Sequence, residues 1–177
     1  MHPFIRRSIV NQLYYSEYIS MESSIFDPNA LLQSTTSESF SRRPPIPAGT
    51  ELIGVIGEVK PRQNAGKKDP TKMYTFLDIP IEIDLSQNPA VMELVGQPKV
   101  TLRDSCILDI TPSGTLDGAP GKNGQLRRYR EALDMNKPGE PFSLLAMQGR
   151  PVRVKIKNED PNNSGELVDS VGAVAKV

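Results

Sequence analysis

Residues 74–84, with the sequence YTFLDIPIEID, decide the fold that this chain predicts. Polar and apolar residues alternate along the stretch with a period of two, which is typical of a strand with one buried side. The side expected to be buried carries Thr75, Leu77, Ile79, Ile81 and Ile83. The opposite side carries Tyr74, Phe76, Asp78, Pro80 and Glu82. Pro80 places the strand at a sheet edge or at a break in the pairing.

Four further strands are predicted around this one, at residues 51–60, 99–110, 151–157 and 167–177. Gly54 and Gly57 predict a bend or bulge in the first strand. Short helices are expected at residues 88–95, closed by Gly96, and at residues 125–135. Residues 61–72 are expected to form a loop. Five strands with a helix between the third and fourth follow the order of the OB fold, so we expect a mainly β chain with minor α, built as an OB-like Greek-key barrel.

The chain divides by composition into two parts. Residues 1–47 are predicted to be an N-terminal extension and a linker rich in Pro and Ser, and residues 48–177 the OB-fold domain. Asp27 and Pro28 predict the start of a short helix in the extension. The tyrosines of the extension suggest an arm that could serve self-association.

Composition excludes several classes of function. The 177 residues (19.5 kDa) carry 21 Lys+Arg and 21 Asp+Glu, so the chain is neither a polycation nor an acidic disordered chain. Cys106 and His2 are the only cysteine and histidine, which disfavours a zinc site or a His-activated nucleophile. No apolar run approaches the ~20 residues of a membrane span, and residues 1–20 lack a clean apolar stretch, so we expect no secretory signal. We therefore expect a cytoplasmic protein without enzymatic activity, metal, cofactor, membrane contact or small-molecule substrate.

Aromatic and basic side chains share the outward sides of the predicted strands. Single-stranded nucleic acid is bound by aromatic rings that stack on bases and by cations that follow the phosphates. The candidate stacking residues are Tyr74 and Phe76. The candidate cations are Lys60, Arg62, Lys67, Lys68, Lys72, Lys99, Arg103, Arg127, Arg128, Arg153, Lys155 and Lys157.

Each of these features also has a purely structural explanation. An outward aromatic residue can pack under a loop or an arm, and outward Lys and Arg keep sheet edges soluble. Arg127 precedes Glu131 by four residues and Arg130 precedes Asp134 by four, a spacing that supports an exposed helix without any ligand. We interpret Arg130 in this way and leave Arg127 and Arg128 open.

The balancing acidic residues are expected to lie apart from the basic clusters. Asp78, Glu82, Asp84 and Glu93 form an acidic stretch, which would leave a basic groove elsewhere on a neutral protein. The glycine-rich residues 114–124 lack the spacing of a phosphate-binding P-loop, although their amides could still receive a phosphate. Cys106 is predicted to face inward as a small core residue.

Several segments together resemble phage-encoded single-stranded-DNA-binding proteins of OB fold. They are residues 47–51 entering a strand, the basic loop, the strand that contains Tyr74, the helix LRRYREAL, and residues 149–152 entering VRVKIKNED. The resemblance covers roughly residues 47–177. It implies a non-sequence-specific role in DNA replication and recombination. The chain departs from the family at its end, VAKV, because many such proteins end in an acidic tail that recruits partners.

Two other functions remain open from the sequence. A viral structural protein, such as a capsid-decorating or connector β-barrel, would use the N-terminal region as an arm that clamps a neighbour. An enzyme domain is the weaker alternative, because its usual nucleophiles and bases are scarce here.

Overall fold

The computed structural model describes residues 27–37 and 42–177. Its contacts divide the chain into two units, Met1–Ser41 and Arg42–Val177. In the first unit, helix α1 spans Pro28–Gln33. Asp27 caps it by accepting a hydrogen bond from the Asn29 N–H (2.8 Å), and Pro28 stands in the first turn, as predicted. The arm predicted from the tyrosines at positions 14, 15 and 18 lies outside the described residues.

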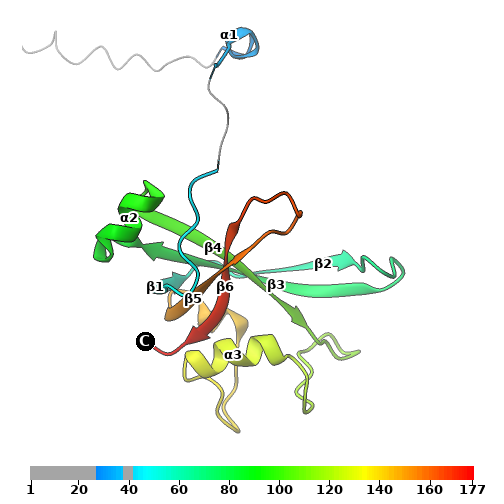
Figure 1. Cartoon of the computed structure of the whole chain (residues 1–177). Coiled ribbons are helices and arrows are strands. Elements are labelled where there is room, and N and C mark those ends of the chain that lie inside the picture. The colour runs from blue at the N-terminus through cyan, green and yellow to red at the C-terminus, as the bar shows by residue number, and fades with distance from the viewer. Residues whose placement is uncertain (1–26, 38–41) are drawn as a thin grey trace, which may run out of the picture. The chain divides into compact units, whose positions relative to one another are not determined.

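The second unit is mainly β, as predicted. Within residues 42–177, six strands form one open antiparallel sheet (Figure 1). They are β1 (Glu51–Ile56), β2 (Lys60–Ala65), β3 (Met73–Asp84), β4 (Lys99–Leu108), β5 (Pro151–Glu159) and β6 (Val168–Ala175). β4 pairs with one edge of β3, and β1 and β2 share the other edge, after which β5 and β6 continue the sheet from β1.

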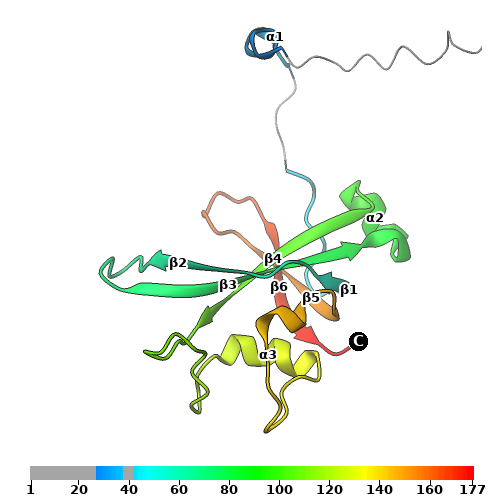
Figure 2. The same ribbon diagram turned by 180° about the vertical axis from the view of Figure 1, so that it is seen from behind.

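Helices follow two of these strands. The short 3₁₀ helix η1 (Leu85–Gln87) and α2 (Pro89–Val95) come after β3, and Gly96 ends α2 in the left-handed region at φ 71°, as predicted. The helix α3 (Gly124–Ala132) comes after β4, and the 3₁₀ helix η2 (Leu144–Met147) precedes β5. Figures 1 and 2 show α2 at one end of the β3–β4 pair and α3 beneath the sheet.

β2 corrects the sequence prediction, which placed a loop from residue 61 onward. All six residues of β2 are exposed, so no buried side produces an apolar alternation that the sequence could reveal. The strand exists because it pairs with the first half of β3 over six residues, from Lys60 opposite Asp78 to Ala65 opposite Met73. Together, β2 and β3 form a hairpin that projects from the rest of the sheet (Figures 1 and 2).

The predicted bend lies between β1 and β2. Ile56 pairs with Ile81 and Lys60 with Asp78, so four steps along one strand face three along the other, which is a one-residue bulge. Gly54 is needed because β1 passes very close to β3. A Cβ at this position would lie 2.5 Å from the Ile81 Cγ2 atom and 2.9 Å from the Ile83 Cγ1 atom.

The core lies on the inner side of the sheet and confirms the predicted alternation. Leu77, Ile79, Ile81 and Ile83 of β3 are at most 1% exposed. The inward residues of β4 and β5 join them, among them Cys106. The predicted apolar face of α3 covers the same core with Leu126, Tyr129, Ala132 and Leu133.

The loop between β4 and α3 is tied down by Asp109 and Asn123. The Asp109 carboxylate accepts the Asn123 N–H (2.8 Å), and the Asn123 amide bonds the Asp109 N–H and carbonyl in return. These bonds lower the pKa of Asp109, chiefly through the Asn123 N–H. The Asn123 N–H, one of the amides expected to be open to a phosphate, is therefore already bonded to the Asp109 carboxylate.

Residues 42–47, the end of the predicted linker, pack onto the sheet. The Ile46 side chain is fully buried. Its N–H donates to Asp169 of β6 (2.7 Å), and its carbonyl accepts from the Asn158 side chain of β5 (3.1 Å). Arg43 adds an ion pair with Asp169 (2.5 Å). The compact unit therefore begins at Arg42.

Candidate nucleic-acid interface

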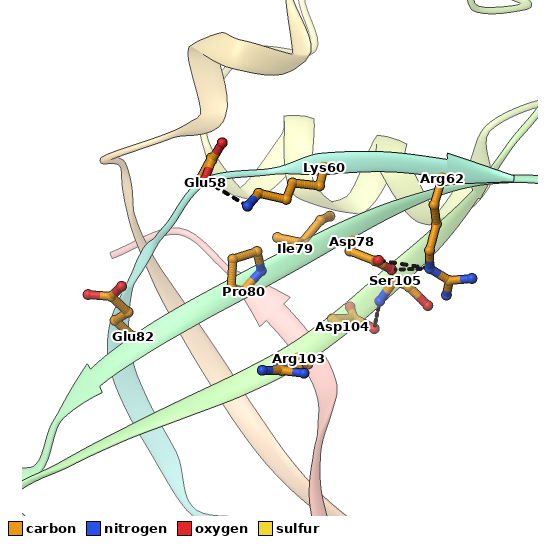
Figure 3. A pocket seen from close by; sticks show the side chains of 10 residues that line it. All are labelled: Glu58, Lys60, Arg62, Asp78, Ile79, Pro80, Glu82, Arg103, Asp104 and Ser105. Carbon is orange, nitrogen blue, oxygen red and sulfur yellow. Dashed lines mark hydrogen bonds and ion pairs between the residues drawn. The ribbon is translucent and has the colours of Figure 1, made fainter. Parts of the chain in front are cut away.

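The outer side of β2, β3 and β4 brings many of the predicted residues together. Cross-strand pairing places Arg62, Phe76 and Ile107 in one row and Lys60, Asp78 and Ser105 in the next. Since residues two apart along a strand share a side, Arg103 also belongs to this outer side. The surface is hollowed into a groove of about 610 Å³ (Figure 3). Its lining includes Lys60, Arg62 and Arg103 together with Glu58, Asp78, Pro80, Glu82 and Ser105.

The two predicted aromatic residues stand on the outer side of β3 and differ in their surroundings. Tyr74 is 40% exposed, and its ring edge lies against the backbone of Gly66, where any Cβ would come within 2.7 Å of the Tyr74 Cε2 atom. Phe76 is half-buried because the Arg62 guanidinium lies over its ring, 4.5 Å from the centroid. Tyr74 thus presents an open ring, and Phe76 a covered one.

Two of the three cations that line the groove form ion pairs with carboxylates. The Arg62 Nε atom donates to both carboxylate oxygens of Asp78 at 2.9 and 2.7 Å, and the Lys60 Nζ atom lies 3.0 Å from Glu58 (Figure 3). The prediction that acidic residues lie apart from the basic clusters is therefore wrong for Asp78 and Glu82. They fall between the cations because they alternate outward with Phe76 on the same strand.

The tip of the β2–β3 hairpin carries three predicted cations. Asp69 folds the tip by accepting hydrogen bonds from the Thr71 N–H (3.1 Å) and hydroxyl (2.5 Å), and these bonds lower the pKa of Asp69. All three are exposed; the Lys72 Nζ atom lies 3.6 Å from the Asp69 carboxylate, whereas Lys67 and Lys68 make no ion pair with the described residues. The tip therefore offers positive charge next to Tyr74.

A second hollow beside the first contains residues that the sequence analysis missed. Exposed Ile53 and Val55 of β1 line it together with the predicted cations Lys99 and Arg153. Both apolar residues stand in the run ELIGVIG, in which every second position is buried, so the remaining positions of that alternation were the available signal.

The other predicted cations lie elsewhere. On β5, Lys155 stands opposite Glu51 of β1, and Lys157 pairs with Glu159 (2.6 Å). Arg127 and Arg128 belong to α3, which packs on the inner side of the sheet and thus away from the groove. Arg127 pairs with Glu131 (3.3 Å), as its spacing predicted.

Arg130 contacts Phe142 and the Met135 carbonyl instead of forming the expected ion pair with Asp134. Its guanidinium lies 4.4 Å from the centre of the Phe142 ring and donates to the Met135 carbonyl at 3.1 Å. The helix ends here because Asp134 adopts the left-handed region (φ 58°), and the Met135 N–H donates back to the Arg130 carbonyl (2.7 Å).

Two groups that could act as a nucleophile or an acid, the Cys106 thiol and the Tyr129 hydroxyl, are buried. Burial raises the pKa of the Cys106 thiol to about 12, which keeps it protonated and inert. Burial and the Asp104 carboxylate raise the pKa of Tyr129, whose hydroxyl donates to Asp104 (2.6 Å). Among residues 27–37 and 42–177, no three acidic, Cys or His side chains cluster so as to hold a metal ion.

Comparisons with known proteins add no relative. No protein-family model matches the chain, and no curated protein matches it in sequence. In the part of the chain that the structure describes, no helix has the length and apolar character needed to cross a membrane.

Proposed function

We propose that the protein binds single-stranded DNA without sequence preference and coats strands exposed during replication and recombination. It acts in the cytoplasm, which is the host cytoplasm if the source is viral, and it acts by binding rather than by catalysis. The observation that carries the proposal is the outer side of β2, β3 and β4. There Tyr74 and Phe76 stand in line with a groove lined by Lys60, Arg62 and Arg103.

The strand order supports an OB-like barrel for this role. β1 and β2 run consecutively along β3 on either side of a bulge, as one bent strand would, which reduces the count to the five strands of an OB fold. β4 and β6, at the two ends of the sheet, contact each other, and α3 lies between β4 and β5 in the chain. OB folds bind oligonucleotides over the side of their second and third strands, which here are β3 and β4.

Because Lys60 and Arg62 are paired with carboxylates, we expect a moderate electrostatic contribution to the free energy of DNA binding. Each phosphate neutralised on a single strand changes the logarithm of the binding constant by about −0.7 per logarithm of salt concentration. Lys67, Lys68, Lys99 and Arg103 make no ion pair within 4.0 Å in the described part of the chain and are the main candidates for phosphate contacts. We expect a salt slope of about −2 to −3 if these four bind phosphates.

A titration of fluorescent oligonucleotides by the full chain tests the proposal. The expected result is tighter binding of oligo(dT) than of a duplex of equal length at moderate salt. Tyr74→Ala should weaken oligo(dT) binding by about 1–3 kcal/mol, because it removes an open stacking ring. Met73→Ala is the matched control, since Met73 is also exposed (59%) but lies on the other side of β3. Equal affinity for single and double strands would overturn the proposal.

A viral structural protein remains the second candidate because of the apolar surface on β1. Ile53 and Val55 are 51% and 44% exposed and stand side by side on the outer side of the sheet. Apolar surface of this kind suits contact with protein better than contact with phosphate. Recovery of the chain at fixed stoichiometry in purified particles would favour this candidate over DNA binding.

A further inference from the structure

Arg62 is held in one orientation by two neighbours on β3. Its Nε atom bonds both oxygens of the Asp78 carboxylate, and its guanidinium lies 4.5 Å from the centre of the Phe76 ring. Phe76 is directly opposite Arg62 in the strand pairing, and Asp78 is the next outward residue along β3. The three side chains therefore form a fixed stack on the outer side of the hairpin, which Figure 3 shows in part.

This arrangement changes what Phe76 and Arg62 can offer to a nucleic acid. One side of the Phe76 ring is covered, so a base cannot reach it without displacing the guanidinium. The charge of Arg62 is paired with a carboxylate, which weakens its attraction for a phosphate. Its side chain nevertheless remains 40% exposed. A guanidinium is planar, and nucleic-acid bases stack on arginine planes as they do on aromatic rings.

We propose that Arg62 is a base-stacking platform, with Phe76 beneath it and Asp78 as positioning residues. The inference rests on the proposed function and assigns the contacts of that site. Tyr74 is the neighbouring platform, because Tyr74 and Phe76 are consecutive outward residues of β3. Residues two apart in a strand are about 7 Å apart. Because the Arg62 guanidinium lies over the Phe76 ring, the spacing of Tyr74 and Phe76 allows two successive bases of an extended single strand to stack on Tyr74 and on Arg62.

A pair of oligonucleotides separates stacking from phosphate binding. One is oligo(dT), and the other is an abasic strand of the same length, which keeps the phosphates and lacks the bases. Arg62→Lys keeps the positive charge and removes the plane. We expect it to weaken oligo(dT) binding by about 5- to 150-fold, with an unchanged salt slope and unchanged binding of the abasic strand.

Lys60→Met is the control for charge. Lys60 lines the same groove and is paired with Glu58, but it has no plane. Its loss should affect the two strands equally. Asp78→Asn tests the positioning role: a released, stacking Arg62 should bind oligo(dT) more weakly, whereas a released, phosphate-binding Arg62 should bind both strands more tightly.

The outcomes separate the two proposals. If the unmodified chain binds oligo(dT) and Arg62→Lys binds it equally well, or if Asp78→Asn strengthens binding to both strands, the stacking role of Arg62 is wrong and DNA binding stands. If the unmodified chain binds neither strand at low salt, the proposed function falls and the platform with it. Circular dichroism of each variant confirms that the sheet is intact.

Discussion

The two halves of β3 belong to the same strand and have opposite surroundings. The half that contains Met73, Tyr74 and Phe76 pairs with a fully exposed strand, and its side chains are exposed or half-buried. The half from Leu77 to Asp84 buries every second residue in the core. One strand thus holds the fold together and also carries the candidate nucleic-acid interface, because its two halves depend on different interactions.

Substitutions that truncate one apolar side chain in each half of β3 to Ala give the sharpest test of this division. Ile81→Ala should lower the free energy of unfolding by about 2–5 kcal/mol, because Ile81 is fully buried and its loss leaves a cavity. Met73→Ala in the other half should stay within about 0.5 kcal/mol. Urea denaturation of the two variants measures both. Similar losses would contradict the division of β3.

Gly54 tests how tightly β1 packs on the buried half. Gly54→Ala should lower the free energy of unfolding by about 1–3 kcal/mol, because the new Cβ would meet Ile81 and Ile83 at 2.5 and 2.9 Å. Gly118→Ala is the matched control, since a Cβ there meets nothing within 4 Å. Thermal unfolding of both variants checks the difference. A Gly54→Ala variant as stable as the control would mean that β1 is free to shift.

Alkaline pH should destabilise the buried half through Tyr129 and Cys106. Asp104, which accepts from Tyr129, is opposite Ile79, and Cys106 is opposite Leu77. Both pKa values are raised by folding, so above about pH 9 for the thiol and pH 10 for the phenol the unfolded chain loses a proton that the folded chain keeps. Stability is therefore complete below pH 9 and falls as the pH rises, by at most about 1.4 kcal/mol per pH unit for each group.

Two variants separate the contributions of Cys106 and Tyr129 to this loss of stability at alkaline pH. Cys106→Val should remove the part that begins near pH 9, and Tyr129→Phe the part that begins near pH 10. Urea denaturation at a series of pH values measures the slopes. An alkaline slope that neither variant reduces would place its origin outside the buried half of β3.

The sequence predicted the buried half well because burial leaves a periodic trace. The inward residues of β3, the apolar face of α3 and the inward Cys106 were all predicted, since each depends on local alternation between apolar and polar residues. The helix caps Asp27 and Gly96 were predicted for a similar reason, because their chemistry acts on adjacent residues.

The exposed half and the candidate site were predicted less well because they depend on pairing between distant residues. β2 carries no apolar alternation, so only its pairing with β3 reveals it. The sequence could place Phe76 and Arg62 outward, but not in contact with each other. Asp78 was assigned to an acidic region elsewhere, because strand register alone brings it beside Arg62.

Ile46 has a practical consequence for anyone who prepares shortened versions of the protein. Composition places the start of the domain at residue 48, yet the side chain of Ile46 is a fully buried core residue. A fragment that starts at residue 48 would lack this core side chain. The Asp169 and Asn158 side chains, which bond the N–H and carbonyl of Ile46, would lose these partners. A fragment that starts at residue 42 keeps the buried Ile46 side chain and both hydrogen bonds, and is the better starting point for crystallisation or NMR.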